Sequence, residues 1–295
     1  MNTPSVFFIF SLLFMLSSCS SSEKSWTKED VIGKVAEQNT SGSGYRDFEG
    51  KMINYNYVDF GSFSLAIHDN KIKWKGEGGY FDDIVALVEP QISKIDEGIY
   101  FMSWFFESGG GDNVCVNFNT NKVYAHLHHP DADTPEDFEL IHGDITCGPS
   151  TECQFPEGEV MGQFSTIMAL FGNIMKFDLP FMGQTERPFS DENKQARKEL
   201  HGKEIKYKTE TSEVVVEVKN HITEVTYKGE PTITYLTYVT KISDGIYFIS
   251  WMGNRDFSDH IIFNQKNMTV TDQLTKNGVH KEMIFDVSCF DDNCK

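Results

Sequence analysis

Gly98-Ile99-Tyr100-Phe101-Met102-Ser103-Trp104 is a stretch of aromatic and branched residues that the chain repeats 147 positions later as Gly245-Ile246-Tyr247-Phe248-Ile249-Ser250-Trp251. In a strand, successive side chains point to opposite faces. Both faces of each copy carry large apolar groups, which is typical of a strand that is covered on both sides. A repeat of this length indicates two similar structural units, so each copy is expected to be a central strand of its own unit.

The composition supports two folded units and excludes one class of partner. With 295 residues and 39% hydrophobic content, the chain can form two domains that each have a core. Its 44 acidic and 26 basic residues give a formal net charge of −18. Such a chain repels phosphate backbones, so nucleic acid is not expected as a partner.

The N-terminus predicts export. Residues 6–16 form an apolar run that is too short to span a bilayer and lies where a signal peptide has its hydrophobic region. The sequence Leu16-Ser17-Ser18-Cys19 resembles the lipobox of bacterial lipoproteins, which implies a signal peptide over residues 1–18 and a lipid on Cys19. Ser20 resembles what outer-membrane lipoproteins carry after the cysteine. The expected location is therefore the bacterial cell envelope, lipid-anchored and in the outer membrane; an ordinary secretory signal with a chance cysteine is the alternative.

Cysteine spacing agrees with export. Each repeat ends in a pair, Cys147 with Cys153 and Cys289 with Cys294. An oxidising compartment would join each pair into a short disulfide-closed loop. Zinc binding is the competing interpretation, which the spacing and the lack of paired histidines disfavour. Cys115 lies within an apolar strand and is expected to be a small buried residue.

The rest of the chain divides into a tether (residues 19–47), repeat one (48–153), a linker (154–199) and repeat two (200–295). A short helix is expected in the tether, capped by Thr27 and Asp30. The repeats consist of short alternating segments between turns, which predicts antiparallel meanders that close into barrels. In the linker, apolar residues recur at helical spacing, which predicts an amphipathic helix whose apolar face packs on one barrel or between the two; these residues are Phe164, Ile167, Met168, Phe171, Ile174 and Met175.

Scattered motifs carry a family resemblance over nearly the whole mature chain. Tyr55-Asn56-Tyr57, Gly78-Gly79, the 98–104 strand and Glu107 are similar to the N-terminal part of phenolic acid decarboxylases. The doubled arrangement, with residues 188–203 leading into the second copy, resembles the family named for molybdenum cofactor biosynthesis protein F. The resemblance implies an all-β calycin architecture: two tandem lipocalin-like antiparallel β-barrels joined by a partly helical linker.

The decarboxylase resemblance also implies a mechanism without a cofactor. Tyr55 and Tyr57 match the tyrosines that bind the substrate carboxylate, and Glu107 matches the glutamate that protonates the alkene. An ungapped comparison puts Asp83 where the family has an arginine. An acidic pocket with tyrosines would repel a carboxylate and suits a cation, an amine or a polyol.

The expected ligand contacts are Tyr55, Tyr57, Asp83, Tyr100 and Trp104. The alternative is that these rings simply fill a narrow barrel. Repeat two keeps one tyrosine, Tyr207, and has Thr209 in place of the second. A pocket is therefore expected in repeat one.

The histidine cluster is the remaining candidate site. His126 and His128 would share one face of a strand, with His142 or Glu139 as a third metal ligand. Because Pro130 ends that strand, we expect the cluster to lie at a solvated rim, and no metal or cofactor is predicted.

Three hypotheses follow. The first is a lipid-anchored module that binds a small organic ligand, phenolic or cationic, in repeat one. The second is a cofactor-free lyase in which Tyr55 and Tyr57 orient the substrate and Glu107 is the general acid. The third is an interaction scaffold with filled barrels.

Overall fold

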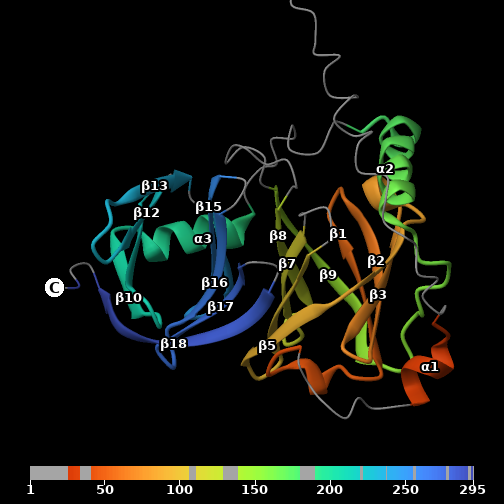
Figure 1. Cartoon of the computed structure of the whole chain (residues 1–295), viewed down its shortest axis with the longest axis horizontal. Helices are drawn as coiled ribbons and strands as arrows, with labels where there is room; N and C mark the ends of the chain where they lie inside the picture. The colour runs from red at the N-terminus through yellow and green to blue at the C-terminus, as the bar shows by residue number, and fades with distance from the viewer. Residues whose placement is uncertain are drawn as a thin grey trace, which may run out of the picture.

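A computed structural model describes residues 26–33, 41–105, 111–128, 139–179, 190–219, 222–236, 238–254, 257–276, 279–291 and 294. The fold is all-β, as predicted, with two nine-stranded antiparallel sheets that each curl on themselves (Figure 1). We call them barrel 1 and barrel 2. Two curled antiparallel sheets in tandem fit a calycin-like architecture.

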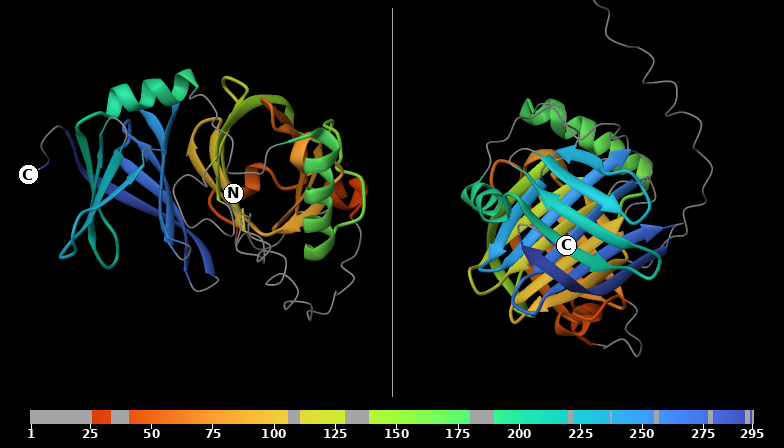
Figure 2. Two further views of the ribbon diagram at one scale, coloured as in Figure 1. Left: turned by 90° about the horizontal axis from the view of Figure 1, so that it is seen from above. Right: turned by 90° about the vertical axis from the view of Figure 1, so that its left-hand side faces the viewer.

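Barrel 1 has the strand order β4-β3-β2-β1-β9-β8-β7-β6-β5. Its edge strands β4 and β5 are consecutive and separated by Glu89 alone, so the chain itself brings the two edges of the sheet together (Figure 2). The strands are β1 (Lys51–Tyr57), β2 (Gly61–His68), β3 (Lys71–Glu77), β4 (Val85–Val88), β5 (Pro90–Asp96), β6 (Ile99–Phe105), β7 (Gly111–Asn117), β8 (Lys122–His128) and β9 (Glu139–Ser150).

Barrel 2 repeats this order as β13-β12-β11-β10-β18-β17-β16-β15-β14. Its edge strands β13 and β14 are again separated by a single residue. The strands are β10 (Lys203–Lys208), β11 (Glu213–Val218), β12 (Ile222–Tyr227), β13 (Ile233–Leu236), β14 (Tyr238–Ser243), β15 (Ile246–Asn254), β16 (Phe257–Asn264), β17 (Thr269–Lys276) and β18 (Val279–Asp291).

The repeated strands β6 and β15 are covered on both faces, as their composition predicts. In β6, Tyr100, Met102 and Trp104 belong to the core inside barrel 1. Ile99 and Phe101 belong instead to a cluster shared with barrel 2. One face of the strand therefore fills its own barrel, and the other contacts the neighbouring barrel.

The outer faces of the repeated strands form the interface between the barrels. The rings of Phe101 and Phe248 pack with centroids 5.3 Å apart. Burial of such side chains is the main favourable contribution to an interface of this kind. The apolar cluster consists of Ile95, Ile99, Phe101, Cys115, Tyr124, Ile242, Ile246, Phe248 and Ile262.

Hydrogen bonds across this interface are reciprocal. The side-chain nitrogen of Asn117 donates to the carbonyl oxygen of Ile242 at 2.9 Å. Asn264, which follows Asn117 by the repeat spacing, donates to the carbonyl oxygen of Ile95 at 3.1 Å. Equivalent patches that exchange equivalent contacts are the signature of a twofold interface. The two repeats thus meet as a pseudo-dimer within one chain.

Helices flank the barrels. The expected capping of the tether helix is confirmed in α1 (Lys28–Gly33), where the Asp30 amide donates to the Thr27 hydroxyl and the Thr27 amide donates to the Asp30 carboxylate. The predicted linker helix is α2 (Gln163–Phe177), on the side of barrel 1 away from barrel 2 (Figures 1 and 2). A third helix, α3 (Asp191–Leu200), packs against barrel 2, and 3-10 turns lie at η3 (Tyr45–Asp47) and η4 (Gly79–Phe81).

Both predicted disulfides are present, Cys147–Cys153 and Cys289–Cys294, each with Cα atoms 5.7 Å apart. Cys115 is buried and free, as expected. Within the described ranges, no helix has the length and apolar character needed to cross a bilayer.

Candidate functional site

The two tyrosines of β1 lie inside barrel 1, as their spacing predicts. Tyr55 is 3% exposed and Tyr57 is 4% exposed, and their ring centroids are 5.0 Å apart. Burial raises the pKa of both hydroxyls far above the usual range, and the negative charge of Asp112 adds to this effect. The tyrosines therefore act as neutral hydrogen-bonding groups.

Asp112 is the acid that shares this interior. It lies on β7, directly opposite Trp104 on β6 in the strand register. Burial raises the pKa of its carboxyl to about 7, against a smaller opposing effect of the Trp104 indole. The residue as a whole nevertheless keeps partial solvent exposure. Asp112 thus lies where the barrel interior meets solvent, and it is about half ionised near neutral pH.

Two buried polar groups beside Asp112 lack a full hydrogen bond. Among the described residues, neither the Tyr57 hydroxyl nor the Trp104 indole nitrogen has a partner at hydrogen-bonding geometry. Each still interacts with a polar neighbour: Tyr55 raises the pKa of Tyr57, and the Trp104 indole lowers that of Asp112. Since buried polar groups are nearly always paired, these two groups are available to a ligand or to water.

Aromatic rings pack densely around the tyrosines. Tyr55 stacks on Phe63 with centroids 5.6 Å apart, and Phe63 contacts Trp74 at 5.9 Å. Phe81 closes the cluster against Trp74 at 5.8 Å. The rings occupy much of the interior next to Asp112, so any ligand there would contact apolar and aromatic surface on most sides.

Another predicted site residue, Tyr100, is not part of this group. Tyr100 lies four residues from Trp104 along β6, roughly 13 Å at the rise of a strand. Its hydroxyl donates to Asp47 at 2.6 Å, and its ring packs on Phe48. Glu107, the predicted general acid, lies outside the described residues.

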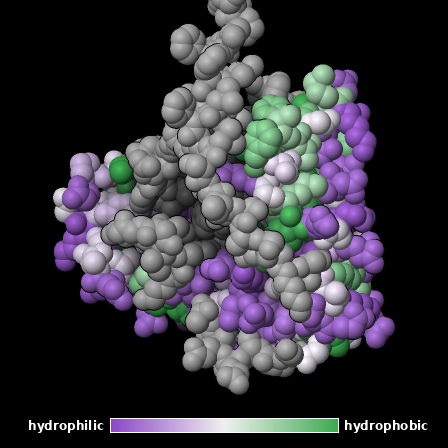
Figure 3. Space-filling model, turned by 45° about the vertical axis from the view of Figure 1, so that its right-hand side comes forward, coloured by the Kyte–Doolittle hydropathy of each residue, from purple (hydrophilic) through white to green (hydrophobic). Residues whose placement is uncertain are grey.

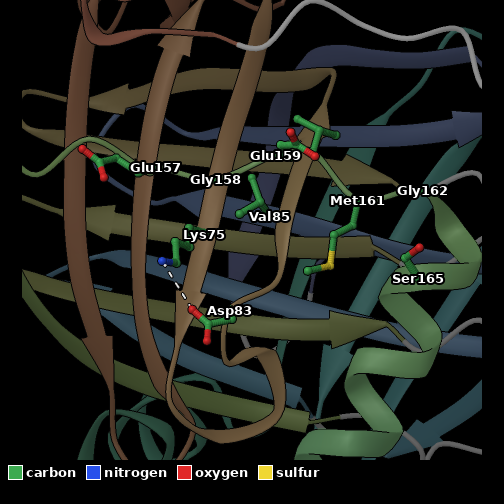
Figure 4. A pocket seen from close by; sticks show the side chains of 10 residues that line it. Lys75, Asp83, Val85, Glu157, Gly158, Glu159, Met161, Gly162 and Ser165 are labelled. Atoms are coloured by element: carbon green, nitrogen blue, oxygen red, sulfur yellow. Dashed lines mark ion pairs between the residues drawn. The ribbon is translucent and has the colours of Figure 1, made fainter.

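Asp83 lies on the outer surface instead of inside the barrel. Its side chain is 78% exposed and forms an ion pair with Lys75 at 3.4 Å. The two residues line a depression of about 440 Å³ between β3 and residues 157–162 (Figure 4). Alternation along β3 places Lys75 on the outer surface, because the adjacent Trp74 points inward. Asp82, next to Asp83 in the chain, binds Lys176 of α2 at 2.6 Å.

The expectation that His126 lies at a solvated rim is wrong. Its side chain is fully buried, because barrel 2 covers the outer face of β8. The ring contacts the Ser250 hydroxyl at 2.5 Å through Nδ1 and the Thr240 hydroxyl at 2.9 Å through Nε2. Burial lowers the pKa of His126 well below its ordinary value, and His260 nearby adds to the shift. The histidine is a neutral interface residue.

The remaining members of the proposed metal cluster do not complete a site. The side chains of His128 and Glu139 lie outside the described residues, and His142 is half-buried. Across the described part of the chain, no group of three or more His, Cys, Asp or Glu side chains is arranged to hold a metal ion.

Barrel 2 contains an acid pair that the sequence reasoning missed. Asp259 and Asp272 are buried, and their carboxyl groups interact directly. Burial raises the pKa of both, and like-charge repulsion raises that of Asp272 further. Two carboxyls in contact share a proton, so the pair carries one negative charge at most near neutral pH. The acids also raise the pKa values of the nearby Tyr207 and Tyr227.

The internal repeat could have revealed Asp112 in barrel 1 and Asp259 in barrel 2. Trp104 is followed eight residues later by Asp112, and Trp251 is followed eight residues later by Asp259. Each pair lies opposite across two neighbouring strands. The shared motif is a tryptophan and an aspartate at the turn end of a hairpin, and it escapes notice because the decarboxylase resemblance draws attention to Glu107 instead.

Comparisons with known proteins give little further information. No family model matches the chain, and no curated protein matches it. Among solved structures, the chain is similar to one described as a putative beta-lactamase from Burkholderia vietnamiensis, at 13% identity over 32% of this chain and 89% of that chain, with a TM-score of 0.29. A likeness at that TM-score carries no argument about function.

Proposed function

We propose that this protein is an exported, lipid-anchored binding protein of the calycin type, similar to the molybdenum cofactor biosynthesis protein F family, and that barrel 1 binds a small aromatic amine. Asp112 supplies the carboxylate, Tyr57 and Trp104 supply hydrogen-bond donors, and the surrounding rings contact the apolar part of the ligand.

One observation carries the proposal: an acid sits inside an aromatic interior without a cation to neutralise it. Within the described residues, no Lys or Arg forms an ion pair with Asp112, and only burial and the Trp104 indole shift its pKa. A buried carboxylate is costly unless a cation or strong donors compensate it. A protonated amine provides both, and aromatic faces also attract such cations.

The test compares three ligands of one shape: 2-phenylethylamine, 2-phenylethanol and 3-phenylpropanoic acid. Binding is measured by titration calorimetry and by thermal shift at pH 8, where Asp112 is ionised. The amine should bind at least tenfold more tightly than the alcohol, and the acid should not bind. Tighter binding of the acid would overturn the proposed charge preference, and binding of none of the three would favour a filled scaffold.

Asp112→Asn is the decisive variant, because it keeps the shape and removes the charge. It should reduce amine binding at least tenfold and leave alcohol binding within about twofold. The control is Asp144→Asn on β9, an exposed aspartate that pairs with Lys122 at 2.7 Å. Equal amine binding by both variants would contradict a role for Asp112.

A cofactor-free lyase is the second candidate, and the pKa of Asp112 favours it. A carboxyl with a pKa of about 7 is matched to general-acid chemistry at neutral pH. In this version Asp112 takes the role that the resemblance gives to Glu107. Release of carbon dioxide from 4-hydroxycinnamic acid, lost in Asp112→Asn and kept in Asp144→Asn, would support the lyase over the binding protein.

A further inference from the structure

Helix α2 exposes a stripe of large apolar side chains to solvent. Phe164 is 58% exposed, Met168 54%, Phe171 49% and Met175 82%. Their spacing of four, three and four residues places all four on one narrow face of the helix. We call this face the α2 stripe. Figure 3 shows the hydrophobic residues gathered over this helix.

The stripe points away from the protein because the opposite face of α2 is the one that packs. Leu170 and Ile174 contact the barrel 1 core, and the buried Asn173 donates to the carbonyl oxygens of Tyr80 and Asp82, each at 2.9 Å. The amide and the ion pair between Lys176 and Asp82 fix the rotation of the helix. The prediction that the apolar face packs on a barrel is therefore wrong for the stripe.

We propose that the α2 stripe docks on the surface of a lipid bilayer and fixes the orientation of barrel 1 on the membrane. A contiguous exposed row of Phe and Met is unusual for a soluble surface and marks an interaction site. An amphipathic helix of this kind lies in the plane of the bilayer interface with its apolar face among the acyl chains.

The charge distribution favours lipid over the anionic or cationic surface of a protein partner. The chain has 44 acidic residues, yet none lies within Gln163–Phe177. A carboxylate on this face would be desolvated on docking at a high cost. The only cation of the helix, Lys176, is paired with Asp82. Docking should therefore be driven by apolar burial and depend little on anionic lipids or salt.

The length of the N-terminal tether agrees with docking of the α2 stripe on a lipid bilayer. The described chain begins at Trp26, whose ring contacts His68 of barrel 1 at 5.6 Å. From Cys19, the expected site of lipidation, seven residue steps reach Trp26, which is at most about 24 Å of extended chain. Both helices lie on the side of barrel 1 that faces away from barrel 2, with α2 toward one end of that side and α1 toward the other (Figure 1). An acyl chain on Cys19 would hold this side against the bilayer, so the inference rests on the proposed anchor.

The test places a tryptophan in the stripe of the full chain. Phe171→Trp is compared with Ile284→Trp, which substitutes another exposed apolar residue, 54% exposed on β18 of barrel 2. Both are mixed with phosphatidylcholine vesicles that carry brominated acyl chains, which quench tryptophan in contact with them. The quenching beyond that of the parent protein should be at least threefold larger for Phe171→Trp than for Ile284→Trp. It should be unchanged between 50 mM and 500 mM salt.

Three results would overturn the proposal. Equal quenching of the two variants would show that the stripe is not oriented toward lipid. A response of Phe171→Trp to protein concentration in the absence of vesicles would assign the stripe to a second copy of the chain. Unchanged quenching of Phe171→Trp in the background Met168→Gln/Met175→Gln, which removes the apolar stripe without touching the packed face, would exclude the stripe as the cause.

Failure of the anchor is detected separately. Mass spectrometry of the full chain shows whether Cys19 is acylated, and Cys19→Ser is the control. If Cys19 is not acylated, the anchor is wrong while the quenching of Phe171→Trp still tests the stripe. Neither result bears on ligand binding in barrel 1, which the Asp112 variants test.

Discussion

Phe101 packs against Phe248, its own counterpart in the second repeat, with ring centroids 5.3 Å apart. A residue that meets its equivalent across an interface lies on the twofold axis that relates the two patches. The pseudo-axis of this chain therefore passes between the two phenylalanines, and the surrounding contacts come in equivalent pairs.

Truncation of Phe101 should destabilise the whole molecule. Phe101→Ala leaves a cavity at the axis and should lower the free energy of unfolding by about 3 kcal/mol, measured by urea denaturation. Phe248→Ala should cost a similar amount, and the double variant less than the sum, because both remove one contact. Phe171→Ala, at an exposed position, is the control and should change stability by less than about 0.5 kcal/mol.

His126 should make the interface sensitive to acid. Its pKa is lowered in the folded state, so unfolded molecules bind the proton more strongly, and stability should fall as pH drops below about 6.5. His126→Gln should reduce this slope. Glutamine is chosen because Gln273 occupies the equivalent position in the second repeat, where it donates to the Ser93 hydroxyl at 2.7 Å. An unchanged slope of stability between pH 5 and 7 would contradict this assignment.

Asp112 should have the opposite pH dependence. Its pKa is raised to about 7, so the folded state holds the proton that the unfolded state releases above about pH 4. Its contribution is lost as pH rises from about 4 to 7 and is constant above that range. Asp112→Asn should therefore stabilise the unliganded protein at pH 8 by up to about 4 kcal/mol, with a smaller gain at pH 5. The midpoint of thermal unfolding at the two pH values measures it; a gain that is larger at pH 5 would refute the raised pKa.

The acid pair of barrel 2 gives a further prediction. Asp272→Asn removes one of two interacting carboxyls and leaves an amide that can still donate to Asp259. Since the pKa of Asp272 is raised, the variant should be more stable than the parent at pH 8, and the difference should shrink toward pH 4. Urea denaturation across this range tests it. A loss of stability at pH 8 would mean that the pair is stabilising as an ionised site, for example around a bound cation.

Local patterns were sufficient to predict the architecture. The repeated strand, the alternation of its side chains and the cysteine spacing predicted two antiparallel barrels and both disulfides, because strand periodicity and short loop closure depend on neighbouring residues. The same alternation placed Tyr55, Tyr57 and Trp104 inside barrel 1.

What the sequence determined was therefore which faces are apolar; what the tertiary structure decided was what covers each face. Barrel 2 covers the outer face of β8, which turned His126 from an expected surface residue into a buried one. Strand pairing brought Asp112 to Trp104 and left Asp83 outside beside Lys75. The packing of Asn173 and Leu170 set the rotation of α2, so that its apolar stripe faces outward. Each of these outcomes depends on contacts between distant segments, which periodicity along a single segment does not encode.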